Sequence, residues 1–548
     1  MFKTIYLLFH TVRHLKVGQI LNRIKRKLVK PRVTLFNIPE NSCPHSKMSP
    51  VIQCSQRMFG KRDFRFLNKE FTLETVGDWN AHNQDKLWLY NLHYFDDLNA
   101  INSEQRVLWH RELIQNWIEN NPQGFGNGWE PYPSSLRIVN WIKWFLLDLN
   151  ASDNFIQAWL DSLVIQTRYL SQNLEYHLLG NHLFANAKAL VFAGLFFKGE
   201  EADRWYLLGI SIIKKELSEQ VLCDGGNFEL SPMYHAIFLE DLLDLVNVHK
   251  SYYKSPPHNL EKKVIQMLEW LKVMCHPDSQ IAFFNDSTLG IAPSFAELLS
   301  YSDRLGIVFK NHQVKRITHL EESGYIRVES KNMVMIADVA DIGPSYIPGH
   351  GHADSLSFEL SLFGKRLIVN SGISTYEIGA DRYKQRGTEF HSTITIDNEN
   401  SSEVWSGFRV ANRAKVFDIK KTDNINSLKF SACHDGYKNL KKGVLHRRQW
   451  SMSDNLIKIT DSILGKGRHD IRSVLPLHPS VLVCDVQGDS ISLEVNGNIV
   501  EISFEGKGKM RIIESRYHPE FGVSINNKHL IYDDNGKLPS EIIIRISW

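Results

Sequence analysis

The sequence predicts an α+β multidomain chain in which a helical half is followed by an antiparallel β half. Two observations carry this prediction. Apolar residues recur at helical spacing from about residue 86 to residue 320, and from about residue 321 the pattern changes to short runs typical of strands. The chain has 548 residues, which is too long for one ordinary hydrophobic core, so we expect at least two large domains.

Residues 1–85 are predicted to form a basic amphipathic segment and an extended connector. Lys and Arg residues are frequent up to Arg32 and no acidic residue occurs among them. Apolar residues recur there at roughly helical spacing: Leu15, Ile20, Leu21, Ile24 and Leu28. Such a helix suits the surface of an anionic membrane, and the alternative is a helix docked on the protein's own body. Prolines between residues 31 and 50 indicate the connector.

Residues 86–320 are predicted to be helical. Leu136, Val139 and Ile142 form part of one apolar face, and Leu239 and Leu242 belong to another. Breaks fall at residues 124–128, 180, 225–226 and 255–257, where glycine or proline occurs. Many amphipathic helices joined by short turns indicate an all-α bundle, solenoid or toroid.

Residues 321–548 are predicted to form a β-sandwich or stacked sheets. The expected strands cover residues 325–328, 334–336, 356–360, 367–369, 393–396, 457–459, 500–504 and 542–546. Phe363-Gly364-Lys365 has the composition of a hairpin turn between two of them.

Composition excludes several classes of protein. The formal charge of +3 is nearly neutral for this length and argues against a nucleic-acid binder. The six cysteines are scattered, which argues against a disulfide framework or a metal-thiolate site. No run of about 18 apolar residues occurs, so no transmembrane span is expected. Because no signal-peptide pattern is recognised, we expect a cytoplasmic protein, with peripheral contact to the inner membrane as the alternative.

Three histidine-containing motifs carry the candidate chemistry. Gly349-His350-Gly351-His352 stands at the entrance of a strand, and its glycines allow the backbone to approach a ligand closely. Asn181-His182 follows Gly180 where a helix begins, and Tyr234-His235 lies near a second helix N-terminus, which favours anions. Together they indicate proton chemistry on a sugar acid. The alternatives are structural: a helix N-cap for Asn181 and a buried, hydrogen-bonded Tyr234.

A basic loop at residues 381–391 offers further contacts. Arg382 and Arg386 suit a bidentate clamp on a carboxylate or sulfate, with Lys384 between them, and the alternative is a solvated loop. His391 at the end of this loop and His352 need only an oxygen donor to form a divalent-ion site.

In this order, the motifs resemble those of the heparinase II/III-like polysaccharide lyases. The resemblance rests on residues 180–182, 229–235, 349–354 and 391–394, and it covers the helical half from about Trp88 and most of the β half. It implies an incomplete (α/α) toroid followed by antiparallel β-sheets, with the active site in the cleft between them. It also implies β-elimination of a uronic-acid polysaccharide, without an organic cofactor. Residues 90–94 and 129–132 look like a branch of the family associated with bacterial surface-polysaccharide loci.

The resemblance assigns the catalytic roles. It implies that Asn181, helped by His182 or His350, hydrogen-bonds the uronate carboxylate, so that charge developing there is stabilised. Tyr234 matches the catalytic tyrosine and is expected to be the acid, and also the base if both protons lie on one face of the sugar. For the opposite configuration His350 is the first candidate base and His182 the second.

Binding residues are expected as well. We expect substrate contacts from five of them: Trp129, Glu229, His235, Arg382 and Arg386. His235 is more a neighbour of the catalytic tyrosine than a catalyst.

His352 and His391 match metal-ligand positions for an ion such as Zn, Mn or Ca. Asn370 stands where related enzymes have an acidic ligand. Either the ion is held more weakly, or Asp354 or Glu389 substitutes, or the site is metal-free.

Other functions remain as alternatives. A glycoside hydrolase needs two carboxylates, for which Asp224, Glu229, Glu240 and Asp241 are available. A C5-epimerase would use the same proton abstraction without cleavage. A non-catalytic glycan-binding or assembly protein would need neither acid nor base. Among lyase substrates, glycosaminoglycan-like polymers of the heparan sulfate, hyaluronan or chondroitin class are favoured.

Overall fold

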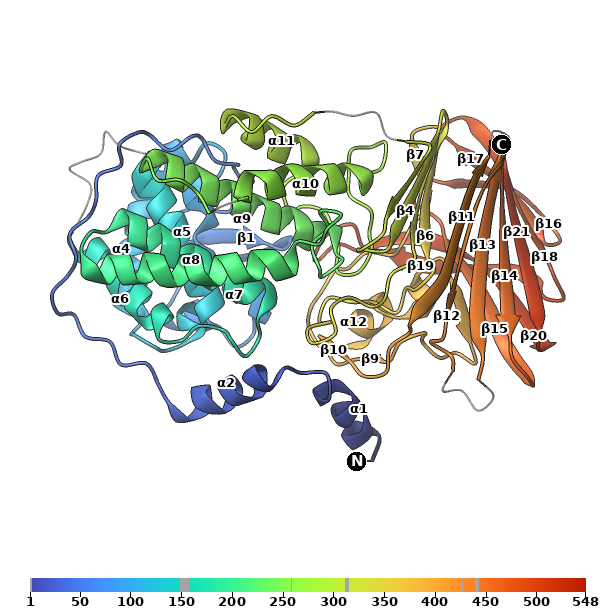
Figure 1. Cartoon of the computed structure of the whole chain (residues 1–548), viewed down its shortest axis with the longest axis horizontal. Helices are drawn as coiled ribbons and strands as arrows, with labels where there is room; N and C mark the ends of the chain where they lie inside the picture. Colours follow the sequence, from blue (N-terminus) through green and yellow to red (C-terminus); the bar gives the residue numbers. More distant parts are fainter. Residues whose placement is uncertain (1, 148–156, 258, 311–314, 425–426, 439–442) are drawn as a thin grey trace.

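The computed structural model describes residues 2–147, 157–257, 259–310, 315–424, 427–438 and 443–548. A helical domain and a β domain lie side by side along the long axis of the molecule, and two N-terminal helices lie beneath them (Figure 1). The predicted α+β fold class is confirmed. The helical domain and the β domain each have a large apolar core of their own.

The helical domain is built around the buried helix α7. Its helices are α3 (Lys86–Tyr94), α4 (Val107–Asn120), α5 (Pro131–Leu147), α6 (Gln157–Ser171), α7 (Gly180–Phe196), α8 (Glu200–Gln220), α9 (Pro232–Ser251), α10 (Leu260–Val273) and α11 (Phe295–Arg304). From Leu183 to Phe196 every residue of α7 is buried, which is typical of a helix surrounded by others. The connector before this domain contains a hairpin of β1 (Asp63–Phe66) and β2 (Lys69–Thr72).

Two helix starts place functional residues. The side chain of Ser231 caps α9 by accepting a hydrogen bond from the backbone N–H of Tyr234, and Pro232 is the first residue of the helix. At the start of α7 the residue in the N-cap position is Leu179, with a φ of 66°, and its side chain makes no capping hydrogen bond. Asn181 is therefore not the N-cap, which overturns the structural alternative for this residue.

The β domain stacks three antiparallel sheets. The first has the order β3 (Ile317–Leu320), β4 (Tyr325–Ser330), β5 (Met333–Asp338), β6 (Phe358–Leu362) and β7 (Lys365–Ile368). The second has the order β19 (Lys509–Tyr517), β20 (Ile525–Lys537), β15 (Arg468–Pro476) and β8 (Ile394–Ile396). One core contains residues of both sheets and of the third, which faces them.

The third sheet is the largest. Its order is β11 (Val416–Asn424), β12 (Ser427–His434), β13 (Leu445–Ser453), β14 (Leu456–Leu464), β21 (Ser540–Ser547), β18 (Asn498–Glu505), β17 (Ser490–Val495) and β16 (Leu482–Gln487). Strands β13 and β14 alternate strictly between buried and less buried residues, as expected for a sheet with one face in the core. A short ribbon of β9 (Val404–Trp405) and β10 (Arg409–Val410) lies at the edge of the domain.

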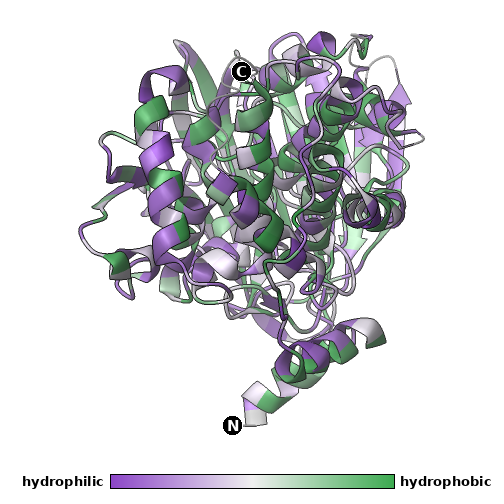
Figure 2. Cartoon of the chain, turned by 90° about the vertical axis from the view of Figure 1, so that its left-hand side faces the viewer, coloured by the Kyte–Doolittle hydropathy of each residue, from purple (hydrophilic) through white to green (hydrophobic). Residues whose placement is uncertain are grey.

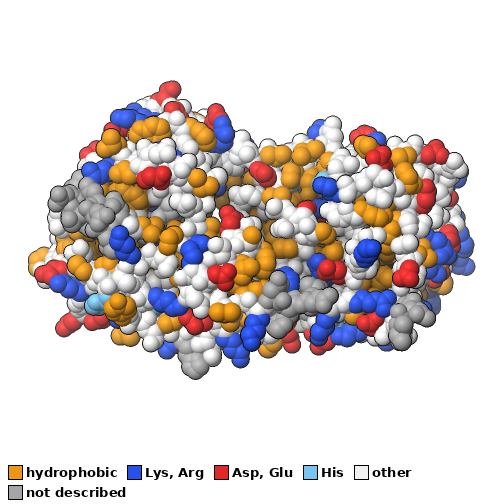
Figure 3. Space-filling view, turned by 90° about the horizontal axis from the view of Figure 1, so that it is seen from above, with side chains coloured by type: hydrophobic (Ala, Val, Ile, Leu, Met, Phe, Trp, Pro, Cys, Tyr) orange, Lys and Arg blue, Asp and Glu red, His pale blue; other side chains and the backbone are white. Residues whose placement is uncertain are grey.

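The N-terminal segment forms α1 (Phe2–Val12) and α2 (Val17–Leu28). Both project below the body of the molecule (Figure 2). Within the described ranges, no helix is long and apolar enough to cross a membrane. Basic and acidic side chains are interspersed over the face in Figure 3, in keeping with the nearly neutral net charge.

Candidate active site

The candidate catalytic residues converge at the seam between the two domains. Asn181 lies in the first turn of α7 and Tyr234 in the first turn of α9, while His350 comes from the loop that leads to β6. The rings of Tyr234 and His350 pack against each other, with 3.8 Å between their centroids. Asn181, Tyr234 and His350, which are far apart in the sequence, therefore lie in one region of the structure.

Asp286 organises the β side of this site. Its fully buried carboxylate accepts hydrogen bonds from Nδ1 of His350 at 2.8 Å and from Nε2 of His352 at 2.9 Å, and it binds the Arg382 guanidinium through both oxygens. Burial alone would raise the pKa of Asp286, but Arg382 and the two imidazoles outweigh burial and hold this pKa well below its usual range. The carboxylate is therefore ionised and fixes both histidines.

His350 is held as a proton acceptor by this arrangement. Because Nδ1 bonds to the Asp286 carboxylate, Nδ1 carries a hydrogen and Nε2 is left to exchange a proton. Nε2 lies 3.6 Å from Oε2 of Glu229, a buried oxygen that forms no hydrogen bond within the described part of the chain. Burial raises the pKa of Glu229. A buried carboxylate, an imidazole and the tyrosine thus share one small space.

Tyr234 is suited to donating a proton. Its hydroxyl lies 3.0 Å from the hydroxyl of Tyr376. Burial, and then the neighbouring Tyr376, raise the pKa of Tyr234 well above its usual value, so the hydroxyl stays protonated at neutral pH. A tyrosine base would instead need a lowered pKa. The structure therefore favours the acid role over the base role at this position.

Asn181 and His182 form the opposite wall of the site. The backbone N–H of Asn181 points at Oε1 of Glu229 at 3.4 Å, and its side-chain amide forms no hydrogen bond with any described residue. Gly180 permits this approach, because a Cβ there would lie 3.0 Å from the same Glu229 oxygen. The amide is thus left available at a helix N-terminus.

The pKa of His182 is raised, whereas those of His352 and His391 are lowered. Burial acts to lower its pKa, but Glu175, whose Oε2 lies 3.3 Å from Nδ1, reverses this effect and raises the pKa of His182 above its ordinary value. The ring also packs on Tyr132, with 4.5 Å between centroids. His182 is therefore protonated more readily than an imidazole free in water.

A second group of residues has the donor set of a metal centre. Ligand atoms of His352, Asp354 and His391 lie within 4.8 Å of one another, and all three residues are buried. Nδ1 of His352 and Nε2 of His391 have no hydrogen-bond partner in the described chain. Burial lowers the pKa of His352 to about 4 and that of His391 well below its usual value, so both imidazoles are neutral, as metal ligands must be. The residues present therefore fit a divalent ion.

Asn370 lies behind this cluster. Its Oδ1 is 3.0 Å from Nδ1 of His391, which directs Nε2 of that histidine toward the cluster. Asp354, one of the alternatives considered for the missing acidic ligand, occupies the carboxylate position, whereas Glu389 lines a different cavity. Burial raises the pKa of Asp354 to about 6, and a bound cation would oppose this shift.

Four predicted binding residues have internal partners. Arg382 and Arg386 are buried: besides Asp286, Arg382 binds the carbonyl oxygen of Gly407, and Arg386 binds those of Gly351 and Gly407. The loop predicted at residues 381–391 is instead helix α12 (Ala380–Gln385) followed by a 3-10 turn, and the alternative of a solvated loop does not hold for the two buried arginines. These arginines hold the histidine loop in place, so the predicted carboxylate clamp is corrected to a positioning role.

His235 and Trp129 are also internal. Both ring nitrogens of His235 bond to backbone, at Asn227 and Met267, and its ring stacks on Trp270. Trp129 is buried, and its indole N–H donates to the carbonyl oxygen of Asn121. Neither side chain has a polar atom left for a sugar. Of the five predicted binding residues, only Glu229 faces the catalytic groups.

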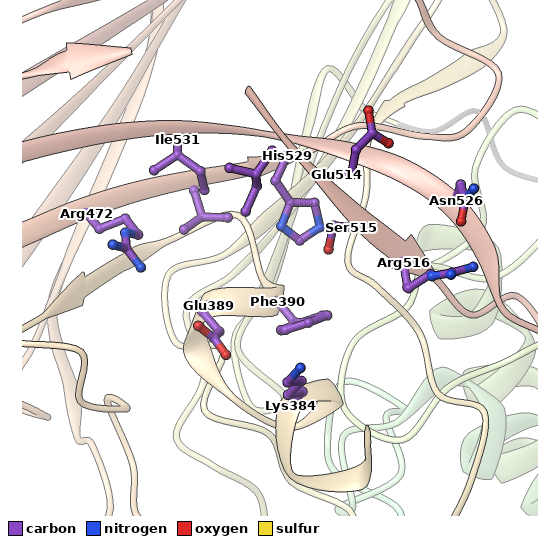
Figure 4. A pocket seen from close by; sticks show the side chains of 12 residues that line it. Lys384, Glu389, Phe390, Arg472, Glu514, Ser515, Arg516, Asn526, His529 and Ile531 are labelled. Carbon is purple, nitrogen blue, oxygen red and sulfur yellow. The ribbon is translucent and has the colours of Figure 1, made fainter. Parts of the chain in front are cut away.

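Lys384 from the same predicted loop does face open space. It lines a cavity of about 520 Å³ between the 3-10 turn and the sheet of β19, β20 and β15 (Figure 4). Arg516 and Glu514 stand at the opposite side, and His529, which is 2% exposed, has no partner for Nε2 among the described residues. This cavity lies apart from Tyr234, whose neighbourhood encloses only about 10 Å³.

Sequence reasoning missed Asp286, Tyr376 and Glu175. Asp286 follows Phe283-Phe284-Asn285, a stretch without a motif signal of its own. Its function depends on partners 64 to 96 residues away in the sequence. In the structure, Asn285 just before Asp286 has a φ of 56°, a left-handed conformation that asparagine adopts more readily than most residues.

Comparison with known proteins identifies the class. A model described as heparinase II/III N-terminus matches residues 58–311, and one described as heparinase II/III-like, C-terminal, matches residues 312–546. The chain belongs to the heparinase II/III-like family.

Two curated relatives are heparin-sulfate lyases. The protein from Pedobacter heparinus is 27% identical over 322 residues, which cover 52% of this chain and 47% of that protein. The protein from Bacteroides thetaiotaomicron is 23% identical over 453 residues, which cover 72% of this chain and 62% of that protein. The matches thus span about half to three fifths of the relatives' length.

Solved structures show the same fold. A crystal structure of heparinase III has a TM-score of 0.73 at 18% identity and covers 97% of this chain and 89% of that chain. A heparan sulfate lyase from Pedobacter heparinus has a TM-score of 0.60 at 18% identity, covering 96% and 87%. These structures have an α toroid followed by β-sheets, as expected from the sequence motifs.

Proposed function

We propose that this protein is a polysaccharide lyase that cleaves a uronic-acid-containing, glycosaminoglycan-like polymer by β-elimination. One observation carries the proposal: a tyrosine that stays protonated packs directly on a histidine that a buried carboxylate orients. An acid and a base side by side at a domain seam are what removal of a proton and expulsion of a sugar require. The lyase activity named for the curated relatives supports this choice of substrate class.

The first requirement of the reaction is neutralisation of the uronate carboxylate. The C5 proton is very weakly acidic while that group is fully charged, so hydrogen bonds that strengthen as charge develops there lower the barrier. Asn181 offers a side-chain amide at the N-terminus of α7, and His182 with its raised pKa offers positive charge beside it. We assign this task to the pair.

The second requirement is proton transfer at C5 and O4. Nε2 of His350 takes the C5 proton, and the electrons of the C5–H bond form a double bond between C4 and C5. The C4–O4 bond breaks, and Tyr234 donates its hydroxyl proton to the departing O4. Asp286 stabilises the imidazolium that results from the first transfer.

A divalent ion held by His352, Asp354 and His391 would supply fixed positive charge on the β side of the site. The chain itself links this cluster to the base, because His352 and His350 bond to opposite oxygens of Asp286. The cluster therefore positions His350 rather than taking part in proton transfer.

The hydrolase alternative has little support in the geometry. Asp241 is ion-paired with Lys188 at 2.6 Å, and Asp224 accepts hydrogen bonds from the backbone and hydroxyl of Ser323. Two of the four carboxylates considered for that mechanism thus have structural partners, whereas the hydrolase mechanism needs a pair flanking the scissile bond.

The decisive experiment is ultraviolet absorbance during incubation with heparan sulfate, hyaluronan and chondroitin sulfate. A rise caused by C4–C5 double bonds, in step with new chain ends, is the expected result. New reducing ends without that absorbance would establish hydrolysis instead. Exchange of the C5 proton with deuterated water without cleavage would establish epimerisation, and binding without any reaction would favour the assembly role.

A further inference from the structure

We propose that α1 and α2 form a docking surface for an anionic lipid bilayer. In the sequence this segment had two interpretations, a membrane-surface helix or a helix docked on the body. In the structure α2 does contact the body, but with its polar side, so that its apolar side faces outward. This orientation is the reverse of that found in an ordinary surface helix.

The polar contacts of α2 define its inner side. Gln19 is 3% exposed, and its amide donates to the carbonyl oxygen of Leu178. Arg26, two turns further along on the same side, hydrogen-bonds the ring of His177 at 2.9 Å. Helical geometry places Gln19 and Arg26 on one face, because residues seven apart are nearly aligned.

The opposite face of α2 is apolar and exposed. Exposure reaches 72% at Val17, 60% at Leu21 and 78% at Leu28, and Ile20 and Ile24 between them are exposed as well. The spacing of these residues forms a single stripe along the helix. Five large apolar side chains in one stripe, with no protein partner in the described structure, need a cover.

Helix α1 repeats the pattern. Thr11 donates to the carbonyl oxygen of Val410 at 3.2 Å, and the side chain of Asn412 donates to the Tyr6 hydroxyl at 2.7 Å, so polar atoms attach this helix to the β domain. Ile5 and Phe9 meanwhile are 57% and 64% exposed. The two helices project from the body (Figure 2), where a flat surface can reach them.

Charge selects the bilayer among the occupants of such a surface. Residues 1–39 contain nine Lys and Arg residues and no Asp or Glu. On α2, Lys25 and Lys27 lie at the two edges of the apolar stripe, where they can meet lipid headgroups while the stripe enters the acyl boundary. The cytoplasmic leaflet of an inner membrane is anionic, in keeping with the location expected from the sequence.

The docking surface also lies beside the catalytic seam. Lys16, just before α2, is ion-paired with Glu219, and its ammonium lies 3.7 Å above the ring of Tyr346, four residues before His350. Leu178, which accepts the Gln19 bond, is three residues before Asn181. Docking would therefore hold the site close to the bilayer.

The test is co-sedimentation of the full chain with phosphatidylcholine vesicles, with and without phosphatidylglycerol. We expect binding only with the anionic lipid, weakened by salt. Lys25→Gln and Lys27→Gln should each weaken it by roughly fivefold. The triple variant Leu21→Glu, Ile24→Glu, Leu28→Glu should reduce binding by about a hundredfold or more, because it puts charge into the stripe.

A matched control separates the surface from apolar exposure in general. Leu108 and Leu207 on α4 and α8 are 70% and 65% exposed, and Leu108→Glu with Leu207→Glu should leave vesicle binding unchanged. Equal binding of the triple variant and the unaltered chain would overturn the proposal. So would concentration-dependent dimers that the triple variant abolishes without any vesicle binding, because the stripe would then be a subunit interface.

Discussion

Replacing Tyr234 with phenylalanine removes one oxygen atom from the site and tests the proposed acid directly. The structure also supplies a matched control. Among the described residues, the Tyr234 hydroxyl bonds only to the hydroxyl of Tyr376, at 3.0 Å, so Tyr376→Phe breaks the same hydrogen bond from the other side. Each change should lower the free energy of unfolding by about 0.5–1.5 kcal/mol. Similar stability with different activity would then isolate the proton donor.

The expected effects on catalysis differ widely between the two variants. A positioned general acid contributes roughly 10²–10⁴-fold in rate, which corresponds to about 3–5 kcal/mol of activation free energy. Tyr234→Phe should therefore lower kcat by that factor with little change in KM, because the hydroxyl acts in the transition state. Tyr376→Phe should lower kcat by less than about tenfold, since it removes one neutral hydrogen bond.

The assay is the initial rate of ultraviolet absorbance increase, with thermal unfolding of each variant measured in parallel. If Tyr234→Phe retained kcat within tenfold of the unaltered chain, the proton would have to come from another group. If Tyr376→Phe were as inactive as Tyr234→Phe at equal stability, the hydrogen bond between the two hydroxyls, rather than the acid, would be the essential feature.

Three further predictions concern Asp286, the histidine cluster and the cavity at Lys384. Asp286→Asn should lower the unfolding free energy by about 3–5 kcal/mol and abolish activity. The control Asp461→Asn breaks a comparable buried pair with Arg448, so it should lower stability by a similar amount but keep the rate per folded molecule. Thermal unfolding and kcat distinguish the two variants. Treatment with a chelator, or His391→Ala, should release one equivalent of metal, detected by elemental analysis, and should lower the melting temperature. An unchanged melting temperature with no metal found would show that the cluster of His352, Asp354 and His391 is metal-free. The 520 Å³ cavity offers a place for an acidic sugar away from the scissile bond. Replacing both Lys384 and Arg516 with alanine should then raise KM for long polymers severalfold without changing kcat. An unchanged KM would exclude that contact.

The fold was predictable because it depends on the spacing of apolar residues along each helix and strand. Strands such as β14 and helices such as α10 bury mainly one face each, so their apolar spacing is visible in the sequence. The hairpin turn at Phe363-Gly364 is confirmed between β6 and β7. The strand expected from residue 356 begins instead at Phe358, because Leu356 adopts a φ of 62° and cannot continue a ladder.

The site was predictable only where its residues occur in short motifs. Asn181, Tyr234 and His350 each stand beside a glycine break or a helix start that marks them out. The charged residues were harder to interpret, because burial decides their function and no periodicity reveals it. The basic segment around Arg382 has the composition of a ligand clamp. The partner of Arg382 is nevertheless Asp286, which lies 96 residues earlier and belongs to no motif.

That partnership explains why the arginines belong to the site without contacting a substrate. A buried carboxylate next to His350 would be neutralised by protonation unless another charge held it ionised. Arg382 supplies that charge from within the β domain, and Arg386 fixes the backbone of Gly351 between the two histidines. His352 bonds to the same carboxylate as His350, so a change at the His352, Asp354 and His391 cluster can shift the proposed base through the Asp286 side chain. The proposed proton transfer thus depends on a buried ion pair between Asp286, which precedes α11 of the helical domain, and Arg382 of the β domain, so neither domain alone contains a complete site.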